Sequence, residues 1–347
     1  MKVTFPAALA VGFALLFGGT AMASTGALYT QTNSAAGNAV HRLDRAPDGS
    51  LTWVATYRTG GAGTSAGLGS QGAVALSDDG RTLLAVDAGS NDVASFHVTR
   101  HGHLTLVDRV PSGGTLPVSV DIADGTAYVL NQGGTTPSVA AFSVDRSADL
   151  RPRSVTPLPA GSNSAAQVSV APDGRSLVVT EKQAGRIDTF PLRNGRLGTP
   201  VLTPSSGPVP FGFAFSPRAD LVVSEAGNST VSSYRNGDLV STSLAVGQGA
   251  ACWVAIDPAG RFAYTGNATG SVSGFKLNRD GSLTALNADG LTATSPRPND
   301  LAFAGSYLYV INPNVGQVTA YKQQPDGSLQ PLPSTTLGTN LAGLAAR

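Results

Sequence analysis

The sequence predicts an all-β fold, a seven-bladed β-propeller made of four-stranded antiparallel blades. Three observations carry this prediction. A unit of about 45 residues recurs along the chain, which is the period of a propeller blade. Each copy contains short runs of alternating side chains, and a period of two is typical of strands. The 42 glycines and 22 prolines supply the turns that many short strands require.

Seven segments are predicted to form the second strand of a blade, because each is a short run that is mostly apolar. They are ALYT (27–30), LLAV (83–86), AYVL (127–130), LVVT (177–180), LVVS (221–224), FAYT (262–265) and LYVI (308–311). Six alternating third strands end in a large ring. They are DVASF (92–96), SVAAF (138–142), RIDTF (186–190), TVSSY (230–234), SVSGF (271–275) and QVTAY (317–321).

Two kinds of turn recur in the repeated unit of about 45 residues. A hairpin of the PDGSL type follows each third strand, and Asn-Gly or Asp-Gly supplies the positive φ angles that tight hairpins require. It occurs at 47–51, 101–104, 147–150, 194–197, 236–239, 280–283 and 326–329. The turn before the second strand occurs only at 79–80, 124–125, 173–174, 219–220, 259–260 and 304–305.

The missing turn indicates how the ring closes. The first repeat begins at a second strand, ALYT, and the chain finishes with NLAGLAA (340–346), which resembles the first strands QGAVALS and FGFAFSP. We therefore expect 340–346 to pair beside 27–30 and complete the first blade, which leaves no open sheet edge between the first and last repeats. Helix is expected to be nearly absent.

The first 23 residues predict a secretory signal peptide. Lys2 precedes an almost wholly apolar run (3–18), and Ala21-Met22-Ala23 has the small-x-small pattern of a cleavage site. We expect residues 24–347 to form one propeller domain in the periplasm or outside the cell. No later segment approaches the roughly 20 apolar residues of a membrane span.

Composition limits the partners. The net charge is +1, charged residues make up 13% of the chain, and no basic or acidic run is present, so neither nucleic acid nor an anionic membrane is expected as a partner. The single cysteine, Cys252, cannot form an internal disulfide. A monomer that binds a small molecule, without cofactor or metal, is the expectation.

In a propeller, small ligands bind at the mouth of the central channel. Polar residues end the predicted second strands there, and we expect the set to bind substrate or to hydrogen-bond the turn backbone. They are Asp87, Asn131, Glu181, Glu225, Asn267 and Asn312. Glu181 and Glu225 are the catalytic candidates, because two carboxylates facing one partly dry cavity raise a pKa toward that of a general base or acid.

The segments that lead into the innermost strands add further candidates. Arg297 is a candidate for binding a carboxylate or stabilising an oxyanion, with a salt bridge to Asp300 or to a neighbouring loop as the alternative. Phe211 and Trp253 suit an apolar wall or a wedge between blades. The remaining candidates for substrate binding are Gln167, Asn299 and Asp300. No histidine has the spacing of a Ser-His-Asp triad, and His101 and His103 lack a third metal ligand.

Several stretches resemble the lactonase family of seven-bladed propellers, which includes propeller-type 6-phosphogluconolactonases and fungal carboxymuconate cyclases. They are QGAVALSDDGRTLLAVDAGSNDVASF, SVAPDGRSLVVTEKQAGRIDTF and ACWVAIDPAGRFAYTGNATGSVSGF. The resemblance covers essentially all of 27–347. It implies a lactone hydrolase or a related cycloisomerase.

The resemblance also implies a site made of a Glu that ends a second strand, with His and Arg at the heads of innermost strands. Glu225 matches the family glutamate. The strand head that would hold the histidine has Ala165-Ala166-Gln167, and the head expected to hold an Arg-His pair has Val209-Pro210-Phe211. This departure keeps a second interpretation open, a non-catalytic ligand-binding or cell-surface interaction propeller. A quinone-dependent dehydrogenase is disfavoured, because only Trp53 and Trp253 are available for docking blades.

Overall fold

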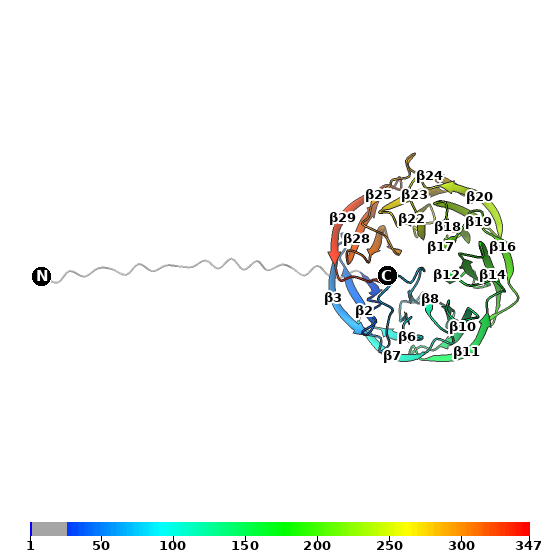
Figure 1. The fold of residues 1–347 in the computed structure, drawn as a ribbon. Helices are drawn as coiled ribbons and strands as arrows, with labels where there is room; N and C mark the ends of the chain where they lie inside the picture. The colour runs from blue at the N-terminus through cyan, green and yellow to red at the C-terminus, as the bar shows by residue number, and fades with distance from the viewer. Residues whose placement is uncertain (2–25) are drawn as a thin grey trace.

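The computed structural model describes Met1 and residues 26–347, and it shows seven antiparallel sheets arranged as blades around a central axis (Figure 1). The predicted all-β propeller is confirmed, and no helix occurs in the described part of the chain. The predicted signal peptide lies outside the described residues, apart from Met1.

Each blade has its innermost strand beside the channel, and the next strands follow outward. Blade 1 contains β30 (Ala342–Ala346), β1 (Gly26–Gln31), β2 (Ala39–Arg45) and β3 (Leu51–Arg58). Blade 2 contains β4 (Val74–Leu76), β5 (Thr82–Asp87), β6 (Asp92–Val98) and β7 (Leu104–Pro111). Blade 3 contains β8 (Pro117–Ala123), β9 (Thr126–Asn131), β10 (Ser138–Val144) and β11 (Leu150–Pro157).

Blades 4 and 6 have an outer strand in two pieces. Blade 4 contains β12 (Ala165–Val170), β13 (Ser176–Glu181), β14 (Arg186–Arg193), β15 (Arg196–Leu197) and β16 (Val201–Pro204). Blade 5 contains β17 (Pro210–Phe215), β18 (Asp220–Glu225), β19 (Thr230–Arg235) and β20 (Asp238–Ala245). Blade 6 contains β21 (Ala251–Ile256), β22 (Phe262–Asn267), β23 (Ser271–Leu277), β24 (Leu283–Ala285) and β25 (Ala293–Thr294). Blade 7 contains β26 (Leu301–Ala304), β27 (Tyr307–Asn312), β28 (Gln317–Gln323) and β29 (Leu329–Thr336).

The ring closes as predicted. The C-terminal strand β30 pairs antiparallel with β1, with Leu28 opposite Ala346 and Gln31 opposite Ala342. The last strand of the chain is therefore the innermost strand of the first blade, and each end of the chain holds the other in place.

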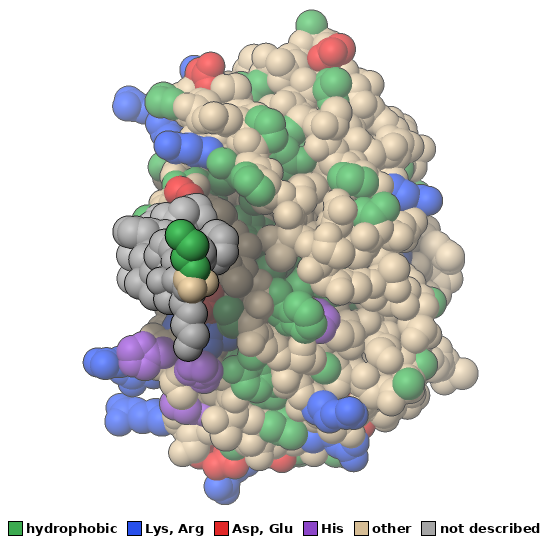
Figure 2. Space-filling model, turned by 90° about the vertical axis from the view of Figure 1, so that its left-hand side faces the viewer, with side chains coloured by type: hydrophobic (Ala, Val, Ile, Leu, Met, Phe, Trp, Pro, Cys, Tyr) green, Lys and Arg blue, Asp and Glu red, His purple; other side chains and the backbone are tan. Residues whose placement is uncertain are grey.

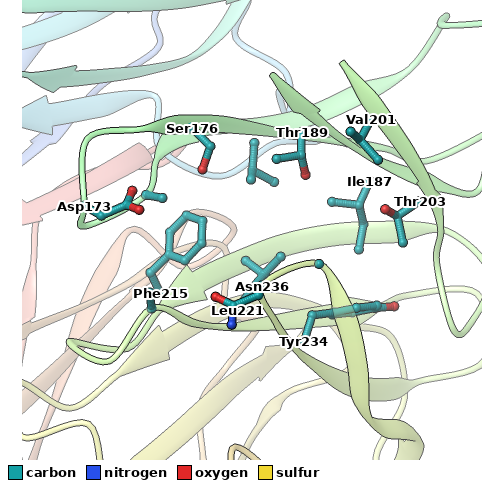
Figure 3. Close-up of a pocket in the computed structure, with 14 residues that line it drawn as sticks. Asp173, Ser176, Ile187, Thr189, Val201, Thr203, Phe215, Leu221, Tyr234 and Asn236 are labelled. Carbon is teal, nitrogen blue, oxygen red and sulfur yellow. The ribbon is translucent and has the colours of Figure 1, made fainter. Parts of the chain in front are cut away.

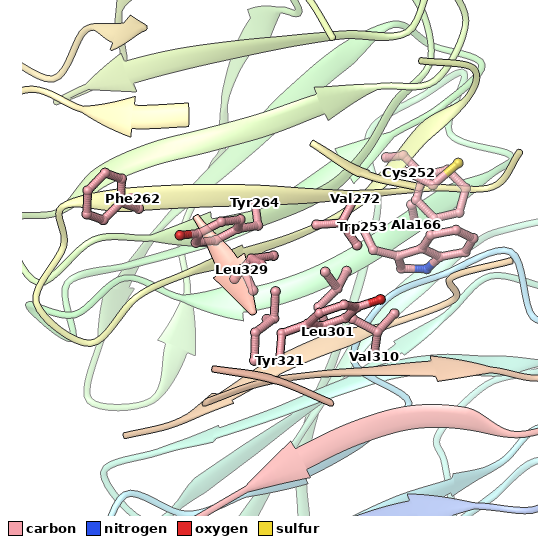
Figure 4. Packing of buried hydrophobic residues seen from close by; sticks show 13 residues of the cluster. Ala166, Cys252, Trp253, Phe262, Tyr264, Val272, Leu301, Val310, Tyr321 and Leu329 are labelled. Atoms are coloured by element: carbon pink, nitrogen blue, oxygen red, sulfur yellow. The ribbon is translucent and has the colours of Figure 1, made fainter. Parts of the chain in front are cut away.

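Burial is greatest in the second strand of each blade. Second strands such as β5 are buried along their whole length, whereas outer strands such as β11 are mostly exposed or half-buried. The core lies between neighbouring blades, and one cluster joins Tyr264 and Val272 of blade 6 to Leu301 and Val310 of blade 7 (Figure 4). Lys and Arg side chains stand mainly toward the two faces of the ring (Figure 2). No helix in residues 26–347 has the length and apolar character to cross a membrane.

The two faces of the ring differ in what they present. On the mouth face, second strands end beside the starts of innermost strands, as the pairing of Glu225 with Pro210 shows. On the opposite face, which we call the hairpin face, lie both kinds of turn that the sequence repeats. The mouth face is therefore where the predicted site residues are placed.

Candidate functional site

A piece of chain from blade 2 crosses the central channel. It is the segment 69–72, which precedes β4 and which we call the channel segment. Ser70 donates to the Val118 carbonyl of blade 3 at 2.8 Å, and the Gln71 backbone N–H donates to the Ala166 carbonyl of blade 4 at 3.2 Å. The Trp253 indole of blade 6 donates to the Ser70 carbonyl at 2.9 Å. The channel is thus bridged by backbone at the level of the innermost strands.

Two side chains fix the channel segment most tightly. The Gln71 amide donates to the Val254 carbonyl at 2.8 Å and accepts from the Val254 N–H at 3.0 Å. Asp300 of blade 7 accepts from the Gly72 N–H at 3.1 Å and from the Leu301 N–H at 2.8 Å. Burial raises the pKa of Asp300 to about 7. Gly212 of blade 5 leaves room for Gln71, because a Cβ there would lie 2.1 Å from the Gln71 side-chain oxygen.

Three of the predicted substrate-binding residues pack around this segment. Gln167 pairs with the backbone of Phe213, accepting from its N–H at 2.8 Å and donating to its carbonyl at 3.0 Å. Phe211 and Trp253 stack edge to face with ring centroids 5.5 Å apart, and both are buried. The structure therefore brings Gln167, Phe211 and Trp253 together as part of the channel wall.

Lys182 is a residue of the channel mouth that sequence reasoning missed. It follows Glu181 directly, so its side chain leaves the strand on the other side. Its ammonium donates to the Gly69 carbonyl and lies 5.0 Å from the centroid of the Phe211 ring. Burial lowers the pKa of Lys182. The neighbouring Cys252 is buried, and its thiol has a pKa raised to about 12.

The polar residues that end the second strands have a repeated structural contact. In blade 3, the Asn131 side chain accepts from the Ser112 hydroxyl at 2.7 Å and donates to the Ser112 carbonyl at 2.9 Å. In blade 7, Asn312 accepts from the Ser295 hydroxyl at 2.8 Å. Each serine lies on the segment that leads from the previous blade into the blade of its asparagine. Each asparagine therefore hydrogen-bonds the connection between two blades. This geometry fits the turn-bonding interpretation of these asparagines.

In blades 2 and 6, the residue that ends the second strand is also held by hydrogen bonds, but from different partners. Asp87 accepts from Thr59 on the entering segment at 2.7 Å and from Asn38 of blade 1 at 2.8 Å, and burial raises its pKa to about 6. Asn267 donates to the hydroxyls of Ser271 and Ser273 at 3.0 and 2.8 Å. All of these side chains are buried.

Glu225 has both carboxylate oxygens occupied within its own blade. Thr230 donates to Oε2 at 2.7 Å, and Ser232 donates to Oε1. The side chain has no exposed surface, and burial raises its pKa. Glu225 also lies against Gly207 of the segment that enters blade 5, so it is covered by this segment and is not exposed in the channel.

Glu181 occupies the equivalent position in blade 4 but in a different environment. Its side chain is fully buried, and neither carboxylate oxygen has a hydrogen-bond partner among residues 26–347. Burial raises the pKa of Glu181 to about 7, and the nearby Asp188 carboxylate adds to the shift. The nearby Ser162 hydroxyl and the charges of Arg186 and Lys182 oppose this shift without cancelling it. Glu181 and Glu225 are thus each buried within their own blade, with different partners, and they do not face one another across a shared cavity.

The sequence of blade 4 explains the difference. Where blade 5 has Thr230 and Ser232, blade 4 has Arg186 and Asp188. These two pair with each other, with Nε donating to Oδ1 at 2.8 Å, so Asp188 gives Glu181 no donor. Arg186 also donates to the Ser162 hydroxyl at 2.8 Å and to the carbonyls of Pro159 and Ala160, so that it holds the segment that enters blade 4. The charged pair in RIDTF is the sequence signal for this site.

Arg297 lies elsewhere in the ring. It belongs to the entry of blade 7, three blades from Glu181 and two from Glu225, and its exposed guanidinium lies 3.2 and 3.3 Å from the side-chain amide of Asn314. Asn299 is half-buried, and its backbone N–H donates to Ile311. Within residues 26–347, no three His, Cys, Asp or Glu side chains gather closely enough to hold a metal ion.

Comparison with known proteins gives a family and several similar folds. The family model described as lactonase, seven-bladed β-propeller, matches residues 36–155 and 229–343. No curated protein sequence matches the chain.

Three solved structures show the same fold. A candidate 6-phosphogluconolactonase from Bacteroides uniformis is 17% identical with a TM-score of 0.77, covering 94% of this chain and 100% of that one. A second candidate 6-phosphogluconolactonase, from Bacteroides fragilis, is 18% identical with a TM-score of 0.76, covering 94% and 99%. A periplasmic gluconolactonase from Pseudomonas aeruginosa is 20% identical with a TM-score of 0.70, covering 92% and 99%.

Proposed function

The chain belongs to the lactonase family of seven-bladed β-propellers, and on this premise we propose that it hydrolyses a small lactone, with Glu181 of blade 4 as the general base. Similarity to a periplasmic gluconolactonase and to candidate 6-phosphogluconolactonases supports lactone hydrolysis as the reaction class. The choice of Glu181 comes from the chemistry of its pocket.

The observation that carries the proposal is the unpartnered carboxylate of Glu181. A general base works best when its pKa lies near the operating pH, and burial raises the pKa of Glu181 to about 7. Both of its oxygens are free of hydrogen bonds within residues 26–347, whereas those of Glu225 accept from Thr230 and Ser232. Perturbed carboxylates of this kind concentrate at functional sites.

The proposed reaction is ring opening by water. Glu181 takes a proton as the water oxygen attacks the lactone carbonyl, and the negative charge develops on the carbonyl oxygen. Arg186, whose guanidinium lies close enough to Glu181 to influence its pKa, supplies a fixed positive charge for that oxyanion. The proton on Glu181 then passes to the departing ring oxygen, which leaves a hydroxy acid.

Access to Glu181 runs through the segment that enters blade 4. Residues Ala160, Gly161 and Asn163 are exposed, while Glu181 lies beneath them with no exposed surface. The contacts between Arg186 and this segment must open for a lactone to enter.

We also propose that the protein acts outside the cytoplasm. Two observations support this location: residues 1–23 resemble a secretory signal peptide, and one of the similar structures is a periplasmic gluconolactonase.

The test compares two isosteric variants on one assay. Purified protein is offered a panel of aldonolactones and aryl lactones, and ring opening is followed by acid release at constant pH. Glu181→Gln is expected to lower kcat at least roughly 100-fold, the scale of lost general-base catalysis. Glu225→Gln is the matched control and is expected to stay within a few-fold of wild type. If Glu181→Gln keeps the wild-type rate and Glu225→Gln loses activity, Glu225 is the general base and the proposal is wrong. Arg297→Ala tests the remaining predicted catalytic residue.

A second candidate function is supported by the channel segment. Because residues 69–72 bridge the channel and Glu225 is fully hydrogen-bonded, the mouth face also suits a propeller that binds a ligand without converting it. Absence of turnover with every lactone in the panel, in a protein whose folding is confirmed by its melting curve, would favour this non-catalytic function.

A further inference from the structure

A groove of about 660 Å³ crosses the end of blade 6 on the hairpin face. It extends from Arg218, in a turn of blade 5, to Pro325 and Asp326, in the hairpin of blade 7. Four other grooves of the ring measure about 300–370 Å³, so this one has about twice their volume. Its size lies within the range of about 300–1,000 Å³ that is typical of small-molecule sites.

The lining of this groove is cationic. One carboxylate, Asp326, stands against four positive side chains: Arg218, Arg261, Lys276 and Arg279. The groove between blades 4 and 5 differs, because its lining has Asp173 and no Lys or Arg (Figure 3). The groove between blades 2 and 3 has four aspartates and two arginines. Since the whole chain has a net charge of only +1, the cations at blade 6 are a local concentration of charge.

Two of the four cations are held in place by the protein. The Arg218 guanidinium lies 3.4 Å from the carboxylate of Asp220. The Arg261 guanidinium lies 3.6 Å from the carboxylate of Asp257 and 5.5 Å from the centroid of the Phe262 ring. These two arginines are therefore positioned before any ligand arrives, and their charges are partly balanced.

The other two cations, Lys276 and Arg279, are exposed and form no ion pair with any carboxylate in residues 26–347. The carboxylates of the two neighbouring hairpins, Asp280 and Asp326, each accept from a serine of their own turn. An anion that enters the groove thus meets two unpaired cations and need not displace a carboxylate.

Apolar side chains form the rest of the groove. Phe262 lies against the hairpin of blade 7, where a Cβ on Gly327 would lie 2.5 Å from its ring. Leu286 follows β24, where the outer strand of blade 6 is interrupted, and Pro325 stands exposed on the blade 7 hairpin. A flat ring system gains contact with such a surface.

We propose that this groove binds an aromatic dicarboxylate, a flat hydrocarbon body that carries two negative charges. Its two carboxylates match the two unpaired cations, Lys276 and Arg279, and its rings lie against Phe262, Leu286 and Pro325. A guanidinium binds a carboxylate through two parallel hydrogen bonds and also stacks on flat rings. The site lies on the face opposite Glu181 and does not depend on the proposed lactone hydrolysis.

Blade 7 repeats the strands of blade 6 without the cationic groove. Lys322 has the position of Lys276, and each stands opposite an aromatic residue of the second strand. Ser306 takes the place of Arg261, and the hairpin arginine is replaced by Pro325. Lys322 therefore provides a matched control that lies outside the lining of the groove.

The first experiment titrates the protein with naphthalene-2,6-dicarboxylate and follows backbone amide shifts by NMR. Saturable shifts are expected at Phe262, Lys276 and Asn278, with half-saturation below about 1 mM. The neutral 2-naphthylmethanol has the same rings and is expected to bind at least about fivefold more weakly. Raising the salt concentration to about 300 mM should weaken binding of the dicarboxylate and leave that of the alcohol unchanged.

The second experiment compares two double variants that each remove one exposed lysine and one exposed hairpin arginine. Lys276→Met with Arg279→Met changes the groove and is expected to weaken dicarboxylate binding about fivefold or more, since exposed ion pairs are individually weak. Lys322→Met with Arg146→Met makes the same changes in blades 7 and 3 and is expected to alter binding less than about twofold.

Four outcomes would overturn the proposal. They are no saturable binding of the dicarboxylate up to about 5 mM, saturable shifts confined to the mouth face, equally tight binding of 2-naphthylmethanol, and equal weakening by the two double variants. The last outcome would mean that net charge, and not the groove, attracts the dianion. If a variant fails to fold, the salt dependence and the neutral alcohol still decide the question on the wild-type protein.

Discussion

The side chain of Gln71 pairs with both backbone groups of Val254, donating to its carbonyl at 2.8 Å and accepting from its N–H at 3.0 Å. Gln71 precedes the innermost strand of blade 2, and Val254 lies in the innermost strand of blade 6. Side chain and backbone therefore complete a contact across the centre of the ring. A propeller whose channel is bridged in this way gains stability at its axis.

We expect Gln71→Ala to destabilise the protein by about 2–4 kcal/mol. The substitution removes two hydrogen bonds and leaves the buried N–H and carbonyl of Val254 without partners, and each unsatisfied buried group costs about 1–3 kcal/mol. Urea unfolding measures the change. Gln330→Ala is the matched control, because Gln330 is exposed on the outer strand of blade 7, and it is expected to shift stability by less than about 0.5 kcal/mol. Equal stability of the two variants would show that the channel segment is not a structural support.

Glu181→Gln is expected to change how stability depends on pH. Burial raises the pKa of Glu181 in the folded protein to about 7, above its ordinary value of 4.5. The folded state therefore binds the proton more tightly than the unfolded state, so this carboxyl favours folding below pH 4.5 and loses that contribution as the pH rises to 7. A neutral glutamine has no such loss.

The variant should accordingly gain stability relative to wild type as the pH rises, by about 1–3 kcal/mol at pH 8, and show little difference at pH 4. Melting curves at both pH values measure this. A constant offset between the two proteins at all pH values would mean that Glu181 does not titrate in this range. The stability result is independent of the lactonase assay, because it requires no substrate.

The repeats were sufficient to predict the fold. Seven apolar second strands and two kinds of turn predict the number of blades, because hydrogen bonding within most blades is set by local alternation and turn chemistry. The pairing of β30 with β1 is a long-range contact, and it was predicted because the first repeat lacks its innermost strand. These are short-range features that a sequence displays directly.

The site was less accessible to sequence reasoning. The strand-end position was found correctly in blades 2 to 7. Whether a carboxylate at this position is satisfied depends on partners from the third strand and the entering segment. Thr230 and Ser232 satisfy Glu225, while Arg186 and Asp188 pair with each other beside Glu181. The channel segment could not be predicted either, since it depends on a long-range contact between Gln71 and Val254.

Arg186→Ala is expected to destabilise the protein by about 3 kcal/mol. Asp188 is fully buried, and Arg186 is its one cationic partner within residues 26–347, so the substitution leaves a buried charge beside Glu181. The same substitution frees the carbonyls of Pro159 and Ala160, so limited proteolysis should cut the segment 159–164 faster than in wild type.

A second substitution separates these two effects. Asp188→Ala added to Arg186→Ala removes the uncompensated charge and should recover part of the stability, while the faster proteolysis at 159–164 remains. Double-mutant coupling of about 1 kcal/mol or more is expected for this contact pair. Additive losses would indicate that Arg186 acts mainly through the entering segment and not through Asp188.

Deleting residues 340–347 should lower the melting temperature sharply. The deletion removes β30, so β1 loses its inner partner and the buried Leu28 and Tyr29 lose part of their cover. It also opens the ring, which exposes strand edges that favour aggregation. Arg347→Ala is the control: it removes only the side-chain bonds to the carbonyls of Gly80, Thr99 and Arg100, and it should cost about 1 kcal/mol. Calorimetry measures the melting temperature of both variants. If the two melting temperatures are equal, pairing of the C-terminal strand does not stabilise the ring.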